Sequence, residues 1–150
     1  MKSNEKGAYL WRTHNPGRVL NGALRRFEQR VMELMDEAGH SRTRRWHVNL
    51  TRHLDLEGTR ITDLARRSAM TNAAMTELIG QCEEIGLVER VSDPADKRAR
   101  IVRFTPGGLQ WLDAFGAAVA IAQREMEEEI GSRGMDVVLK SLARYAGPAE

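Results

Sequence analysis

The chain has 150 residues, of which 41% are hydrophobic and 29% are charged, as expected for one ordinary domain with a core of its own. Its longest uncharged run, residues 114–123, has about half the length of a membrane span, and residues 1–6 lead into no signal-peptide core. Cys82 is the single cysteine, which excludes an internal disulfide and a multi-cysteine metal site. We therefore expect a single domain over residues 1–150 in a cytoplasmic protein without membrane contact.

The net charge of +2 is unevenly distributed along the chain. Residues 1–54 carry +6, residues 55–105 carry −1 and residues 106–150 carry −3. A basic front third favours a polyanionic partner, although ordinary solvated helix faces would produce the same distribution.

The first periodic segment predicts a helix over residues 16–38. Asn15 and Pro16 are a typical N-cap and first helical residue, and Gly39 is a typical stop. The apolar positions between them follow alternating steps of four and three residues. Such a narrow seam is typical of packing against another helix, either in this chain or in a second copy.

Short helices, two strands and two further helices are predicted in the rest of the chain. Thr59 is the expected N-cap of the second short helix, and Thr71 is that of the third. After Gly86 the pattern changes to strand-like runs separated by a charged turn. The predicted segments are short helices near 46–54, 61–68 and 71–85, strands at 87–91 and 100–104, and helices over 107–130 and 135–145.

Residues 61–78 fit a helix-turn-helix, in which small and apolar positions allow two short helices to cross. Ala69 stands where the turn needs a small residue, and Leu64 and Met75 are expected beneath it. The second helix then exposes side chains that suit a DNA major groove, since Asn pairs with adenine and small residues contact thymine methyls. Thr71 serves equally well as a plain N-cap. The expected base-contacting set is Thr71, Asn72, Ala73 and Thr76.

A hairpin directly after a helix-turn-helix makes a winged helix. Arg98 lies at the hairpin tip, from which an arginine can enter a minor groove. Asp96 is placed to hold that guanidinium, and Lys97 and Arg100 add positive charge. The alternative is a charged edge hairpin that only maintains solubility.

Three stretches of the sequence resemble the wing signature of the MarR family of multiple-antibiotic-resistance type regulators. They are LVER at 87–90, DPADKRA at 93–99 and FTPGG at 104–108, and the order of helices around them also agrees. The resemblance implies a homodimer that binds pseudo-palindromic DNA and represses until a small, often aromatic molecule binds. It also implies dimerisation helices at 16–38 and 107–146 and a DNA-binding lobe at 45–105.

Two departures from the family pattern concern the recognition helix. Glu77 is acidic, and residues 71–85 contain no Lys or Arg. We therefore expect phosphate contacts to come from the wing, from the basic first third, and from Arg60, Arg66 and Arg67.

The apolar faces support a dimer independently of the resemblance. A winged-helix core over residues 45–105 cannot cover the seams of the helices at 16–38, 107–130 and 135–145 together. Two copies of the chain can bury them in one shared core.

An effector pocket would need aromatic rings to stack on and a cation to pair with a carboxylate. Core or dimer packing is the competing interpretation for each candidate. Cys82 shares an apolar helix face and is expected in the core, where a thiol is unreactive. The four histidines show no metal-ligand pattern, and no cofactor is expected. The ligand candidates are Trp11, Arg12, Trp46, His47, Trp111 and Phe115.

No nucleophile elbow, phosphate loop or apolar acid–base pair indicates an enzyme. We expect a mostly α-helical fold with a small β-hairpin, formed by a winged helix-turn-helix lobe and terminal dimerisation helices. Its expected function is that of a homodimeric, sequence-specific DNA-binding repressor released by a small aromatic or anionic ligand. The alternative is a winged-helix module that binds other proteins and lacks specific DNA binding.

Overall fold

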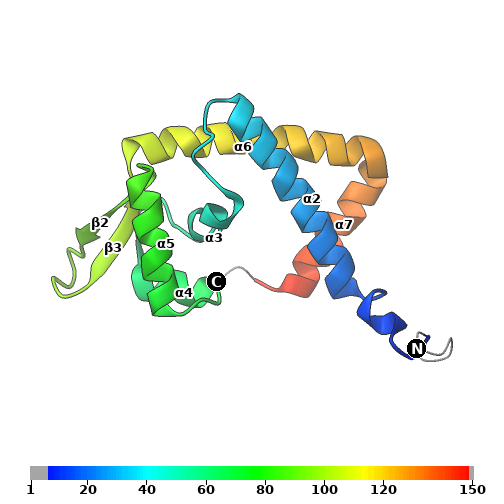
Figure 1. Cartoon of the computed structure of the whole chain (residues 1–150), viewed down its shortest axis with the longest axis horizontal. Helices are drawn as coiled ribbons and strands as arrows, with labels where there is room; N and C mark the ends of the chain where they lie inside the picture. The colour runs from blue at the N-terminus through cyan, green and yellow to red at the C-terminus, as the bar shows by residue number, and fades with distance from the viewer. Residues whose placement is uncertain (1–6, 149–150) are drawn as a thin grey trace.

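The computed structural model describes residues 7–148 and is mostly helical, with one small antiparallel sheet. The long helix α6 runs along one side of the molecule, α2 crosses it, and the wing and α7 extend at opposite ends (Figure 1). In the described residues no helix has the length and apolar character needed to cross a membrane. The elements are η1 (Leu10–Arg12), α2 (Pro16–Glu37), η2 (Arg45–His47), α3 (Val48–Thr51), β1 (Thr59–Arg60), α4 (Ile61–Arg67), α5 (Asn72–Glu84), β2 (Val88–Ser92), β3 (Arg100–Phe104), α6 (Pro106–Ile130) and α7 (Ser132–Ala146).

Side-chain caps start three of these helices, and two of the caps, Asn15 and Thr71, are those that the sequence indicates. The Asn15 carboxamide oxygen accepts a hydrogen bond from the backbone N–H of Arg18 at 3.0 Å, at the start of α2. The Thr71 and Thr105 hydroxyls accept in the same way, from Ala74 at 3.1 Å and Gly108 at 2.9 Å. These bonds satisfy N–H groups that have no partner within the helix.

Two local predictions are wrong. Thr59 does not cap α4, because it lies in a strand, where its buried hydroxyl accepts from the backbone N–H of Asp55 at 2.9 Å. The cap position of α4 is Arg60, which makes no side-chain capping bond. The helix expected near 46–54 is reduced to a 3₁₀ turn followed by the four residues of α3.

The wing is a three-stranded sheet rather than a two-stranded hairpin. Strand β3 lies in the centre, paired with β2 along five residues and with β1 along two. Thr59 is opposite Val102 in this ladder. The extra strand joins the wing to the start of α4, so the helix-turn-helix and the wing form one body.

The core lies where the helix-turn-helix, the sheet and the crossing of α2 with α6 meet. Leu50, Leu64, Met75, Ile79 and Cys82 are fully buried there. Burial raises the pKa of the Cys82 thiol to about 12. A thiol in this state is a poor nucleophile, which supports the packing role expected from the sequence.

Candidate nucleic-acid interface and ligand cavity

The helix-turn-helix has the geometry that its sequence predicts. Ala69 takes a left-handed backbone conformation, with φ of +52°, in the turn between α4 and α5. The backbone N–H of Met70 then donates to the carbonyl of Ala65 at 2.9 Å and closes the turn. A left-handed conformation is costly for side chains with a Cβ and least costly for small ones, which explains the small residue at this position.

The predicted recognition residues lie together on the exposed face of α5. Thr71, Asn72, Ala73 and Thr76 are all exposed, while Met75 on the opposite face is completely buried. Thr71 is the N-cap, and the Thr76 hydroxyl donates to the carbonyl of Asn72 at 2.8 Å. Asn72 contributes the side-chain amide among these four exposed residues.

The wing tip carries its positive charge into solvent. Lys97 and Arg98 are exposed, and no carboxylate within residues 7–148 forms an ion pair with either. The Asp96 carboxylate accepts from the backbone N–H of Arg98 at 3.0 Å, so it shapes the turn and does not hold the guanidinium as expected. The Arg100 guanidinium makes a weak contact with the Ser92 hydroxyl at 3.4 Å.

Asp93, which the sequence analysis did not select, links the wing to the helix-turn-helix. Its carboxylate accepts from Arg60 at 2.9 Å and 2.7 Å and from the backbone N–H of Ala95 at 2.8 Å. The Ala95 bond and the Arg60 guanidinium hold the pKa of this buried carboxyl below its ordinary value. The signal in the sequence was an aspartate directly after a strand, a position typical of turns.

Many of the arginines expected to contact phosphate are engaged within the chain. Arg60 binds Asp93, and Arg67 binds both the Asp55 carboxylate and the His53 carbonyl at 3.0 Å. Other ion pairs engage arginines of the basic first third, of α4 and of the strands, so fewer cations are available to phosphate than the formal charge indicates. These pairs are Arg26–Glu129, Arg30–Glu125, Arg45–Glu28, Arg52–Glu28, Arg66–Asp63, Arg90–Glu83 and Arg103–Glu89.

The six ligand candidates do not gather in one place. Trp11 and Arg12 are exposed on η1, near the N-terminal end of the molecule and far from the wing (Figure 1). Trp46 is exposed on η2, where its indole N–H donates to Gln81 of α5 at 3.2 Å. Trp111 is buried and stacks on Phe115 with ring centroids 4.8 Å apart.

His47 is buried next to Trp46 and has a structural contact. Its Nδ1 accepts from the backbone N–H of Arg44 at 2.9 Å. Burial lowers the pKa of this imidazole, so it is neutral at neutral pH. Within residues 7–148 no group of three or more acidic, histidine or cysteine side chains could hold a metal ion.

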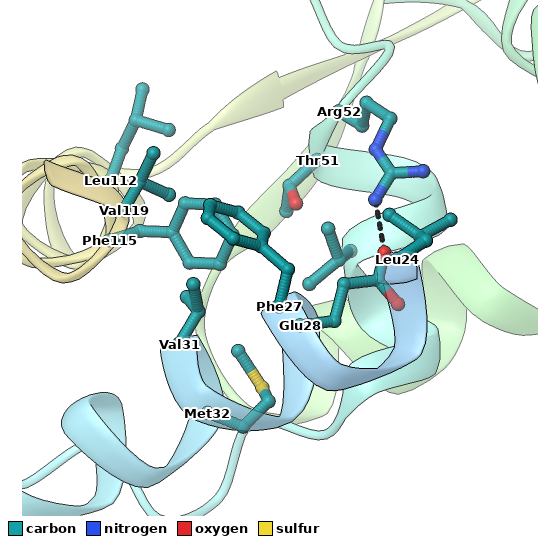
Figure 2. Close-up of a pocket in the computed structure, with 11 residues that line it drawn as sticks. Leu24, Phe27, Glu28, Val31, Met32, Thr51, Arg52, Leu112, Phe115 and Val119 are labelled. Atoms are coloured by element: carbon teal, nitrogen blue, oxygen red, sulfur yellow. Dashed lines mark hydrogen bonds and ion pairs between the residues drawn. The ribbon is translucent and has the colours of Figure 1, made fainter. Parts of the chain in front are cut away.

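A cavity of about 460 Å³ lies between α2, α3 and α6, and Phe115 is the one ligand candidate that lines it. Figure 2 shows the Phe27 and Phe115 rings entering this space from α2 and α6, with Glu28 and Arg52 paired at its edge. The lining is predominantly apolar, as in small-molecule pockets. Its residues are Leu24, Phe27, Glu28, Val31, Met32, Val48, Thr51, Arg52, Leu112, Phe115 and Val119.

Comparison with known proteins finds similarity to one family of regulators. The sequence profile of the MarR family matches residues 49–99, from α3 through the wing tip. The transcriptional regulator HosA of Escherichia coli O111:H- is 36% identical over 77 residues, which are 51% of this chain and 55% of HosA. The chain thus matches the MarR family over the segment that forms α3, the helix-turn-helix and the first part of the wing. This family consists of winged-helix transcriptional regulators and not of enzymes.

Solved MarR-type structures show that the fold extends beyond the matched segment. CouR of Rhodococcus jostii RHA1, solved with a 23-mer DNA duplex, has a TM-score of 0.71 at 20% identity, covering 93% of this chain and 97% of CouR. Apo MarR from E. coli has a TM-score of 0.69 at 18% identity, covering 89% and 98%. Identities this low establish the shared fold alone. HosA is matched over only about half of its length.

Proposed function

We propose that this chain is a homodimeric, sequence-specific DNA-binding repressor that a small aromatic or anionic ligand releases from DNA. The observation that carries the proposal is the pairing of an exposed recognition face, which has no Lys or Arg and carries Glu77 as its charged residue, with a wing tip whose cations form no ion pair within residues 7–148. Asn72 and its neighbours read base edges in the major groove, and Arg98 enters the adjacent minor groove. CouR, a repressor with this fold, was solved with DNA and with p-coumaroyl-CoA, which supports both parts of the proposal.

The dimer is supported by apolar surface that one copy leaves in water. Helix α7 packs mainly against α6, and Met135 is its one buried residue. Val137 and Leu139 remain 57% and 51% exposed, and Val19 on α2 is 67% exposed. Apolar patches shared between several helices are typical of protein interfaces, and a second copy is the occupant that the family favours.

The ligand is assigned to the cavity between α2, α3 and α6. Phe27 and Phe115 provide rings for aromatic contact, and Arg52 provides a cation at the edge. The cavity adjoins both α2 of the proposed dimer core and α3 of the DNA-binding lobe. A ligand that fills it is therefore placed to change the angle between the two.

Fluorescence anisotropy on a duplex from upstream of its own gene, compared with random DNA across a salt series, tests DNA binding. We expect preferential binding that weakens steeply with salt, since phosphate contacts release counterions. Equal, weak and salt-insensitive binding to both duplexes would contradict this function and would favour a protein-interaction module.

The wing contact is tested in the same assay with Arg98→Ala. We expect binding about three- to tenfold weaker and a salt slope reduced by about one, as for loss of one phosphate or groove contact. Arg124→Ala is the matched control, because Arg124 is exposed on α6 away from the wing. Equal losses in both variants would show a general charge effect and remove the role of Arg98.

A further inference from the structure

Glu28 connects two arginines at the edge of the ligand cavity. Its carboxylate accepts from the Arg52 guanidinium and lies 3.2 Å from the Arg45 Nε. Glu28 belongs to α2, Arg45 to η2, and Arg52 follows α3 directly. The three side chains thus form an ionic link between the proposed dimerisation helix and the DNA-binding lobe.

Glu28 is the least solvated member of this link. Its side chain is 14% exposed, whereas those of Arg45 and Arg52 are 50% and 42% exposed. A carboxylate shielded from water to this degree is stabilised by its cationic partners. Glu28 and Arg52, which line the cavity, cancel in charge, and Arg45, outside the lining, gives the three-residue link a net charge of +1, so the link retains capacity for an anion.

The remainder of the cavity suits a flat apolar group. Leu24, Phe27, Val31 and Phe115 line it, and only Glu28, Thr51 and Arg52 contribute polar groups. A ligand ring packed between Phe27 and Phe115 would direct a polar substituent to the position where Glu28 and Arg52 meet (Figure 2). No other pair of opposite charges lines this cavity.

We infer that Glu28 is an internal stand-in for the carboxylate of an aromatic acid effector, which competes with Glu28 for Arg52 when it binds. This inference rests on the proposed ligand function of the cavity and specifies its ligand class and its switch. An incoming carboxylate takes the guanidinium of Arg52, and Glu28 loses that partner. The link between α2 and the winged lobe is then weakened by the same event that fills the cavity.

Calorimetric titration with 2-naphthoate and its uncharged isostere 2-naphthamide tests the competition without DNA. The wild type is expected to bind the acid more tightly than the amide. Glu28→Gln removes the competitor and leaves a charge of +2, so it should bind naphthoate about five-fold more tightly, with naphthamide unchanged. Glu33→Gln is the matched control, since Glu33 is on the same helix, pairs with Arg30 at 3.3 Å and does not line the cavity.

Arg52→Gln is a second variant, which tests the inference even if Glu28→Gln does not fold. It should lose the preference for the acid over the amide while keeping its affinity for the amide. Naphthoate binding that is unchanged in Glu28→Gln would overturn the role of Glu28 and leave the ligand cavity intact. If neither naphthoate nor naphthamide binds to the wild type or to Glu28→Gln, the cavity is not an effector site. DNA binding is judged separately, by anisotropy.

Discussion

At the scale of single residues, specificity and affinity are carried by different parts of the proposed interface. Asn72 presents a carboxamide on a helix face that has no Lys or Arg, while Lys97 and Arg98 extend their cations into solvent from the wing tip. Most other arginines near this surface are bound to carboxylates. Contacts with phosphate position a protein on DNA, and contacts with bases select the sequence. Substitution of Asn72 should therefore reduce sequence preference, and substitution of Lys97 or Arg98 should reduce overall affinity.

Asn72→Ala should lower discrimination between operator variants more than it lowers affinity for random DNA. A bidentate Asn–adenine contact contributes about 1–3 kcal/mol of preference for the correct base. Competition binding against single-base variants of a bound duplex measures this quantity. The loss should be confined to one base position per half-site, and an unaltered preference profile would exclude Asn72 from base reading.

Asp93→Asn should loosen the wing in a pH-dependent manner. The folded-state pKa of Asp93 is depressed by the Ala95 N–H and by Arg60, so its charge stabilises the fold above the ordinary pKa of 3.8. That stability is lost as the pH falls below 3.8 toward the folded-state value. Urea unfolding from pH 7 to pH 3 should therefore show wild type more stable than Asp93→Asn at neutral pH, with the difference narrowing in acid.

A difference in stability that stayed constant down to pH 3 would show that the Asp93 charge has no part in the link. Asp96→Asn is the control, since Asp96 is exposed and its carboxylate accepts only the backbone N–H of Arg98.

At the scale of elements, local hydrogen bonds explain why some boundaries could be predicted from the sequence. The caps at Asn15, Thr71 and Thr105 use bonds across three residues, and these helices begin where the pattern indicates. Strand β1 has only two residues and exists because β3 lies beside it, so no periodic signal marks it. Thr59 was misinterpreted as a cap for the same reason.

The candidate site also has a part that could be predicted from local sequence and a part that depends on distant contacts. The recognition face was predicted because the helical period separates exposed from buried positions, as the exposed Ala73 and the buried Met75 show on nearly opposite sides of α5. Of the residues that line the cavity, only Phe115 was among the predicted ligand candidates, because Glu28 and Phe115 meet only through the crossing of α2 and α6. An acidic residue beside the apolar seam of a helix was the available signal for Glu28.

The junction between the wing and α6 depends on close backbone packing. A Cβ on Gly108 would lie 1.9 Å from the carbonyl oxygen of Leu87, which is backbone and cannot rotate away. Gly108→Ala should therefore separate β2 from α6 and destabilise the fold by about 2–4 kcal/mol, as measured by urea unfolding.

Gly116→Ala is the control for this prediction. Gly116 lies in the same helix with nothing within 4 Å of its Cβ position, so alanine should stabilise the protein slightly through helix propensity. Similar effects of the two substitutions would show that helix propensity, and not contact with Leu87, determines the role of Gly108.

At the scale of the whole molecule, the proposed function requires two lobes held at a fixed separation. One copy leaves α7 with a nearly bare apolar face, and α2 and α6 cross beside it (Figure 1). A dimer built on these helices would present two copies of α5 to the same side of a duplex. Recognition helices that enter successive major grooves are about 34–36 Å apart, or about 10–10.5 base pairs.

Hydroxyl-radical footprinting on DNA from upstream of the gene is the decisive measurement of the proposed function, because it reports sequence preference and dimer geometry together. A homodimeric winged-helix repressor should give protected patches on one face of the duplex, with two half-sites centred about 10–10.5 base pairs apart and extra protection where each wing meets the minor groove. Uniform protection or none at protein concentrations that saturate the duplex would contradict the proposed function.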